Sequence, residues 1–243
     1  MKTRILIIGA HQDDIEIMGC QAIVKAKEVD AEVIGIVCSD NGLIRYNEQH
    51  KAARMGGFEV HQLYYSTEML RNPQIETGIL NDLIKFYKAD FILTHNLMDN
   101  HPTHIAVCMR VIKAMRQEDF PPCVLFGCEV WGSLDWLPNR TQLVLDYSEI
   151  GVIKSLIGQH QSRITPFRNY TEAAVGRLIA NATFCRENKK NEFEMASNVM
   201  DMTELVSNHE LTPMEFIKQH ISMFEQEKLL RIMNFITPQN MEG

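Results

Sequence analysis

The sequence lacks the features that mark several classes of protein. Its six cysteines include no CxxC pair, so neither a disulfide framework nor a thiolate zinc site is predicted, and we expect buried free thiols. No stretch approaches the roughly 18 consecutive apolar residues of a membrane-spanning helix. No long basic run occurs, and the formal net charge is −7, which argues against nucleic acid as the main partner.

The apolar run near the start of the sequence is too short for a signal peptide. It is about five residues long and ends at His11 and Asp13, so we expect a cytoplasmic protein. The chain has 243 residues, of which 45% are hydrophobic, and this is enough for one sizeable core. Because internal repeats and linkers are also absent, we predict a single domain over residues 1–243, mostly helical from about residue 149 onward.

Strand-like and helix-like segments alternate through the first half of the sequence. This alternation is typical of βαβ units and predicts an α/β fold with a mainly parallel sheet. Strands are expected at 4–10, 31–40, 60–65, 90–95, 120–130 and 141–148. Helices are expected at 20–30, 47–57, 76–89, from Pro102 onward, and at 149–162, 170–189 and 213–235. The last of these helices has an apolar face suited to packing on a partner subunit.

Polar groups gather where the predicted strands end. Residues 7–20 read IIGAHQDDIEIMGC, so a histidine and two adjacent acids follow the first strand. Charged side chains avoid apolar surroundings unless they are paired, and a positive charge is therefore expected beside Asp13 and Asp14. Further polar groups follow the second strand (Asp40, Asn41) and the fourth (Asp99, His101, His104). In parallel sheets these strand ends form the ligand crevice.

Two imidazoles and one carboxylate from these loops would make a three-ligand set with an open position for water, which suits catalytic zinc. Adjacent acids point in different directions, so one can bind the metal while the other takes a proton from the zinc-bound water. His101 and Arg45 are candidates for stabilising the oxyanion and protonating the leaving amine. Taken singly, the two acids could instead cap a helix, and the histidines could be exposed loop residues.

These motifs resemble those of the LmbE-like, or PIG-L-type, family of zinc-dependent N-acetylglucosaminyl deacetylases. Residues 10–14 match its Ala-His-x-Asp-Asp loop, and residues 99–104 match its Asp-x-His-Pro-Asp-His loop except at Thr103. The SDNG turn at 39–42 and the segment KSLIGQHQS at 154–162 add weaker matches. The resemblance covers about the first 165 residues and implies a Rossmann-like, three-layer α/β fold in which helices flank the sheet.

The resemblance also implies roles for individual residues. Zinc, with Fe²⁺ as an alternative, would be held by His11, Asp14 and His104. Asp13 would be the general base, and His101 an electrostatic partner or acid opposite it. Arg45 would contact the substrate or oxyanion, and Asp99 would orient His101 or contact the substrate. The implied substrate is an N-acylated amino sugar or glycoconjugate that loses its acyl group, and a homo-oligomer is expected.

Three departures from the family pattern bear on the substrate. Gln12 stands where proline is common, Thr103 replaces an aspartate, and MGCQA lacks the paired glycines. A hydrolase for a different amide or ester therefore stays open, as does a binding or assembly protein that has lost catalysis. A nucleotide-binding module is disfavoured, because two carboxylates in the first loop would repel phosphate.

Overall fold

The computed structural model describes residues 2–26, 28–39, 42–117, 120–138, 141–145, 149–184 and 194–236. Two of the polar residues considered above, Asp40 and Asn41, lie outside this described part, as does Cys185. The other five cysteines are free thiols, of which only Cys123 is partly exposed.

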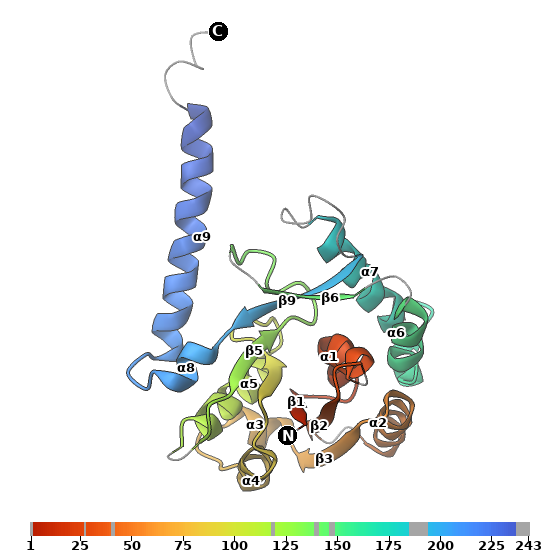
Figure 1. Ribbon diagram of the computed structural model, residues 1–243. Coiled ribbons are helices and arrows are strands. Elements are labelled where there is room, and N and C mark those ends of the chain that lie inside the picture. The colour runs from red at the N-terminus through yellow and green to blue at the C-terminus, as the bar shows by residue number, and fades with distance from the viewer. Residues whose placement is uncertain are drawn as a thin grey trace.

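One sheet of seven strands runs through the molecule in the order β3-β2-β1-β4-β5-β9-β6 (Figure 1). Neighbouring strands from β3 to β5 are parallel, whereas β9 pairs antiparallel with both β5 and β6. The strands are β1 Thr3–Gly9, β2 Ala31–Ser39, β3 Glu59–Tyr65, β4 Phe91–His95, β5 Val124–Cys128, β6 Thr141–Leu145 and β9 Met195–Asp201. A separate two-stranded hairpin consists of β7 Ile164–Thr165 and β8 Arg168–Asn169.

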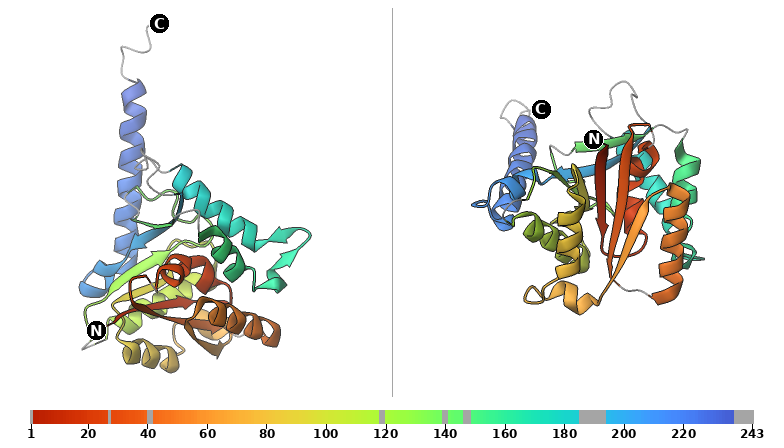
Figure 2. Two further views of the ribbon diagram at one scale, coloured as in Figure 1. Left: turned by 45° about the vertical axis from the view of Figure 1, so that its right-hand side comes forward. Right: turned by 60° about the horizontal axis from the view of Figure 1, so that its bottom comes forward.

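Helices cover both faces of this sheet (Figures 1 and 2). One face packs against α1 Asp14–Lys25, α2 Gly42–Gly56, α6 Ile150–Ile157 and α7 Tyr170–Thr183. The other packs against α3 Thr67–Arg71, α4 Gly78–Tyr87, α5 Pro102–Met115 and α8 Thr203–Ser207. The remaining helical segments are the short turn η2 Gln161–Arg163 and the helix α9 Pro213–Ile236. The structure thus has the three-layer α/β architecture that the sequence predicts.

The molecule has two hydrophobic cores, one on each face of the sheet, and the interior strand β1 contributes residues to both. Leu6 and Ile8 belong to the core beneath α4 and α5, while Ile7 belongs to the core beneath α1 and α6. All three side chains are fully buried. A strand covered on both faces reads as a continuous run of aliphatic residues, which is why this segment was predictable.

Several elements differ from the sequence-based expectations. Helix α1 begins at Asp14 rather than at residue 20, so the second acid of the pair is its first residue. Helix α5 begins at Pro102, as expected, and its N-cap is His101. The strand β9, the hairpin and the short helices α3 and α8 were not predicted.

Helix α9 extends away from the rest of the molecule (Figure 1). Phe216 is its one buried residue among those described, and apolar side chains farther along, such as Leu230 and Met233, are exposed. No helix in the described part of the chain combines the length and the apolar character needed to cross a membrane.

Candidate metal centre

Three predicted ligands meet at the carboxyl end of the sheet. His11 follows β1, Asp14 opens α1, and His104 lies in the first turn of α5. Nδ1 of His11 lies 3.3 Å from Oδ2 of Asp14 and 3.2 Å from Nε2 of His104. Nε2 of His104 lies 3.7 Å from the same Asp14 oxygen. Because β1 and β4 are adjacent strands in the sheet, the loops that follow them lie side by side although they are more than 80 residues apart in the sequence.

These separations fit a tetrahedral metal ion. Bonds of about 2.0–2.1 Å from nitrogen and oxygen ligands to zinc imply donor-to-donor distances of about 3.3 Å. The donors of His11, Asp14 and His104 are 3.2, 3.3 and 3.7 Å apart. Two other groups of three that share His104 also have metal-compatible spacing, one with His11 and His101 and the other with Asp14 and His95. The donor set thus suits a divalent metal of the zinc or iron type.

The backbone of the first loop is shaped closely around Asp14. A Cβ added to Gly9 would lie 2.7 Å from Cβ of Asp14, so a larger residue there would displace the carboxylate. Asp13 has a φ of 96°, which non-glycine residues rarely adopt. Such strain is concentrated at functional sites because the surrounding structure must maintain it. Here the unusual backbone conformation at Asp13 turns the side chains of Asp13 and Asp14 in different directions.

Asp99 contacts the His104 ring on the side away from the other donors. Its Oδ2 lies 3.1 Å from Nδ1 of His104, while its Oδ1 accepts a hydrogen bond from the backbone N–H of His101 at 2.8 Å. A carboxylate at Nδ1 leaves Nε2 free as a ligand atom and fixes the orientation of the ring. Asp99 was expected to orient His101 or to contact the substrate. In the structure its side chain contacts the backbone N–H of His101 and the ring of His104.

His95 was not identified from the sequence, although it also ends a strand of the sheet. It is fully buried, and its ring stacks on His104 at 3.8 Å between centroids. Its Nε2 accepts a hydrogen bond from the N–H of Ala10 at 2.9 Å and lies 3.2 Å from Oδ2 of Asp14. Because the lone pair of that nitrogen already accepts a hydrogen bond, His95 is better suited to supporting the loop than to ligating an ion. Burial lowers its pKa, and the ring is therefore neutral.

The imidazoles determine the charge of Asp14. Burial acts to raise the pKa of its carboxyl, but His104, His95 and a hydrogen bond from His11 together hold that pKa well below its usual range. Burial lowers the pKa of His104, and Asp14 and Asp99 outweigh this and raise it. Three imidazoles thus surround the Asp14 carboxylate.

Asp13 has different partners. Arg45 donates to its Oδ1 at 2.8 Å and also donates to the backbone carbonyl of Gln12. Nε of Arg163 lies 3.2 Å from its Oδ2. Burial and the nearby Asp14 carboxylate raise the pKa of Asp13 to about 6, against the lowering effect of the two arginines. The predicted substrate residue Arg45 therefore contacts the predicted base, whereas Arg163 was assigned no role in the sequence analysis.

A buried polar network lies beneath Asp13. His160 and Glu16 are at most 1% exposed and form a contact of 2.9 Å between Nε2 and Oε2. Gln49 donates to the other oxygen of Glu16 at 2.6 Å, and its own amide oxygen accepts the N–H of Asp13 at 3.4 Å. This network supports the strained loop from below. His160 lies in the KSLIGQHQS segment, but local sequence offers no sign that it pairs with Glu16.

His101, the remaining predicted site residue, and Gln12 and Thr103, two of the three departures from the family pattern, have defined places in the structure. His101 is exposed, and its ring centroid lies 4.9 Å from that of His11. The amide of Gln12 donates to Gln62 at 3.0 Å. Thr103 is buried and accepts a hydrogen bond from Nε of Arg71 at 2.9 Å. Both departures are thus accommodated by polar partners without displacing the donor set.

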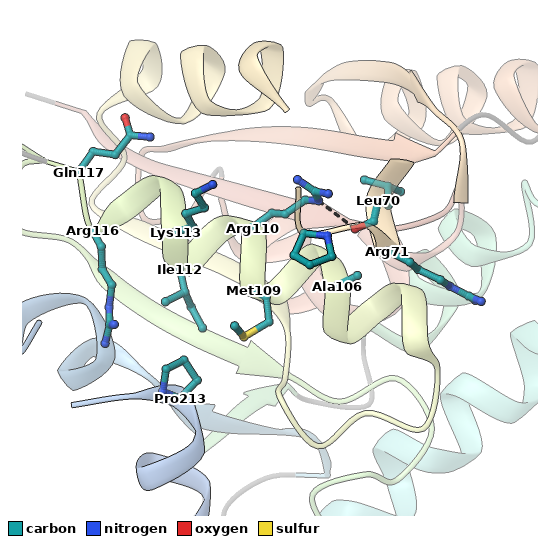
Figure 3. Close-up of a pocket in the computed structure, with 11 residues that line it drawn as sticks. Leu70, Arg71, Ala106, Met109, Arg110, Ile112, Lys113, Arg116, Gln117 and Pro213 are labelled. Carbon is teal, nitrogen blue, oxygen red and sulfur yellow. Dashed lines mark hydrogen bonds between the residues drawn. The ribbon is translucent and has the colours of Figure 1, made fainter. Parts of the chain in front are cut away.

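A cavity of about 640 Å³ lies elsewhere, along the outer side of α5 (Figure 3). Its cationic groups already have partners within the protein. Arg110 and Arg116 donate to backbone carbonyls, and Lys113 pairs with Glu76 at 2.7 Å. None of the imidazole or carboxylate donors described above lines it. This cavity is therefore separate from the candidate metal centre.

Residues 6–115, which include all of these donors, match the sequence profile described as PIG-L: GlcNAc-PI de-N-acetylase. Residues 6–115 belong to the PIG-L, or LmbE-like, family. The matched region runs from β1 to the end of α5 and so contains both halves of the candidate metal centre. No curated protein matches the sequence.

Solved structures share the fold at low sequence identity. N,N'-diacetylchitobiose deacetylase from Pyrococcus horikoshii is 19% identical, with a TM-score of 0.66 and coverage of 87% of each chain. GalB, the 4-carboxy-2-hydroxymuconate hydratase from Pseudomonas putida KT2440, is 16% identical, with a TM-score of 0.62 and coverage of 83% of this chain and 96% of its own. A zinc-inhibited form of the teicoplanin deacetylase Orf2 is 11% identical, with a TM-score of 0.62 and coverage of 82% and 98%. The fold of this chain is thus shared by deacetylases and by a hydratase.

Proposed function

We propose that this chain is a metal-dependent N-deacetylase that removes an acetyl group from an N-acetylated amino sugar. The observation that carries the proposal is the meeting of Nδ1 of His11, Oδ2 of Asp14 and Nε2 of His104 within 3.7 Å, beside a second carboxylate that faces elsewhere. The PIG-L family match and the deacetylases among structural neighbours support the same reaction class. Similarity of fold alone would not support this reaction class, because a hydratase has the same fold.

In this proposal His11, Asp14 and His104 hold the metal, and Asp99 keeps the His104 ring in place. When bound, zinc or Fe²⁺ supplies Lewis-acid activation for the attack of water on an amide carbonyl. The donor set fits either ion. Because zinc inhibits one relative with this fold, the identity of the metal has to be measured on this chain.

Asp13 serves as the general base. Its pKa of about 6 lets it be ionised at neutral pH and still accept a proton from the attacking water. Arg45 and Arg163 engage one oxygen each, and a carboxylate has about four lone-pair sites, so acceptor capacity remains for that proton. The same carboxyl can then pass the proton to the leaving nitrogen. His101, exposed beside His11, is placed to stabilise the developing oxyanion.

Elemental analysis of protein purified without added metal, combined with an amine-release assay over N-acetyl amino sugars, tests this function. We expect about one transition-metal ion per chain, loss of amine release on chelation, and its return with Zn²⁺ or Fe²⁺. A stoichiometric metal without amine release from any of these sugars would contradict the proposal. Consumption of 4-carboxy-2-hydroxymuconate instead would place the chain with the hydratase.

The exposed apolar residues of α9 support a homo-oligomer as part of this proposal. Leu229, Leu230, Ile232 and Met233 are each 51–63% exposed on a helix that extends from the body. Covering such residues in a second copy would remove them from water. Sedimentation equilibrium should give a multiple of 28.0 kDa, and a mass of 28.0 kDa at micromolar concentration would contradict this prediction.

A further inference from the structure

Three aromatic side chains gather at the surface beside the candidate metal centre, and the proposed mechanism gives them no role. Trp131 follows β5, Phe167 lies at the tip of the β7–β8 hairpin, and Tyr170 is the first residue of α7. Trp131 is 41% exposed and Phe167 is 96% exposed. The rings of Trp131 and Tyr170 meet edge to face, with centroids 4.9 Å apart. We call Trp131, Phe167 and Tyr170 the aromatic platform.

The aromatic platform is connected directly to the proposed base. Nε of Arg163 lies 3.2 Å from Oδ2 of Asp13, and the Cζ of the same guanidinium lies 5.6 Å from the ring centroid of Tyr170. One arginine side chain therefore spans the distance from the acid to the platform. A substrate whose amide reaches Asp13 would have its next chemical group near Tyr170.

The loop that carries Trp131 is braced on both sides. Arg177 contacts Glu129 at 3.3 Å and also pairs with Asp135. Gly132 has a φ of 80°, and a Cβ added to it would lie 3.3 Å from Cζ of Arg177. An exposed tryptophan on a loop fixed by ion pairs is preorganised, so a ligand need not supply the ordering free energy.

The platform lines a shallow, open surface pocket of about 460 Å³. Arg168 and Asn169 add polar groups, and Ala173 is the sole aliphatic residue in its lining. An acyl chain would favour an aliphatic slot, which this cavity does not offer. A sugar ring combines an apolar C–H face, which packs on aromatic rings, with hydroxyls that need polar partners at the edge.

We propose that the aromatic platform binds a second sugar ring, linked to the N-acetylated sugar at the metal centre, so that the preferred substrate is an oligosaccharide. This inference rests on the proposed deacetylase function, which places the N-acetylated sugar at the metal centre. Stacking on two aromatic rings is expected to favour a disaccharide over the corresponding monosaccharide by about 10-fold.

Calorimetric binding to the Asp13→Asn variant, with metal bound, tests the inference separately from catalysis. N,N'-diacetylchitobiose should bind about 10-fold tighter than N-acetylglucosamine. Adding Trp131→Ala should remove that preference, whereas Trp131→Phe should retain most of it. Phe86→Ala, at an exposed aromatic on α4 outside the platform, serves as the matched control and should leave the preference unchanged.

Turnover by the wild-type chain then separates the two proposals. Trp131-dependent disaccharide binding without any acetate release would defeat the proposed function and leave the second-ring site standing. Acetate release from both sugars, with equal binding of both and no effect of Trp131→Ala, would overturn the second-ring site alone. A change of oligomeric state in Trp131→Ala, seen by sedimentation with the sugar preference intact, would assign the platform to a subunit contact and also overturn it.

Discussion

Asp13 and Asp14 are adjacent in the sequence, and the fold gives them opposite surroundings. Asp14 faces the imidazoles of His11, His95 and His104, and its pKa is well below the usual range. Asp13 faces the guanidinium groups of two arginines, and burial raises its pKa to about 6. An imidazole can be neutral and offer a lone pair to a metal, whereas a guanidinium stays charged and offers none. The partners of each acid therefore support the proposal that Asp14 ligates a metal and Asp13 moves a proton.

The largest expected effect is on the imidazole side. His104→Ala removes one of the three donors, so the metal content should fall from about one per chain to near zero, and kcat/KM by roughly 10³-fold or more. Metal analysis and amine release measure the two quantities. His209→Ala, at an exposed histidine after α8, is the matched control and should change neither. Full metal occupancy in His104→Ala would show that the ligand set is wrong.

The next effect separates the two acids. Asp13→Asn keeps the shape of the side chain but removes the proton acceptor, so kcat should fall by about 10²- to 10⁴-fold while the metal stays bound. Asp14→Asn should instead lose metal along with activity. Parallel metal analysis and rate measurements on both variants test the division, and metal loss in both would contradict it.

A smaller effect is expected at the residue that supports one ligand. Asp99→Asn removes the carboxylate 3.1 Å from Nδ1 of His104, and metal affinity should weaken by about 10- to 100-fold. Competition with a chromophoric chelator measures this affinity. Asp13→Asn is the comparison and should bind the metal as tightly as the wild type. Equal affinity in wild type and Asp99→Asn would mean that the ring is oriented by its packing against His95.

The smallest effect concerns the network beneath Asp13. The pKa of His160 is raised above its ordinary value of 6.5, because the Glu16 carboxylate outweighs the lowering effect of burial. The stabilisation is therefore complete below about pH 6.5 and is lost as the pH rises through the folded-state pKa. His160→Gln should lower the free energy of unfolding by about 2 kcal/mol at pH 6 and by less at pH 9. Urea unfolding at both pH values measures this, and an equal loss at both would argue against a charged His160.

The sequence predicted the imidazole side far better than the guanidinium side. The strands β1 and β2 are aliphatic runs, and the rule that the carboxyl ends of parallel strands converge predicted that the loops after β1 and β4 meet. The family resemblance then selected His11, Asp14 and His104 from the polar residues of these loops. The same rule could have identified His95, which ends β4. Arg163 and His160 lie about 150 residues from Asp13 in segments without a strand-end signal, so only the fold reveals their partners.

The strand β9 shows a second limit of the sequence. Its residues MASNVMD include Ser197 and Asn198, which interrupt the aliphatic pattern of a buried strand. The Ser197 hydroxyl has a partner inside the protein, since it accepts a hydrogen bond from the side chain of Gln21 at 2.5 Å. Local hydropathy cannot anticipate partners that are distant along the chain.

The insertion of β9 between β5 and β6 has a consequence for biosynthesis. A ribosome makes β5 and β6 before β9, yet β6 can join the sheet only through β9. Until residue 201 has emerged, β5 keeps an unpaired edge on the growing chain, which is the kind of edge that recruits other strands and leads to aggregation. The nascent protein thus completes this sheet only after every segment from β1 to β9 has been made.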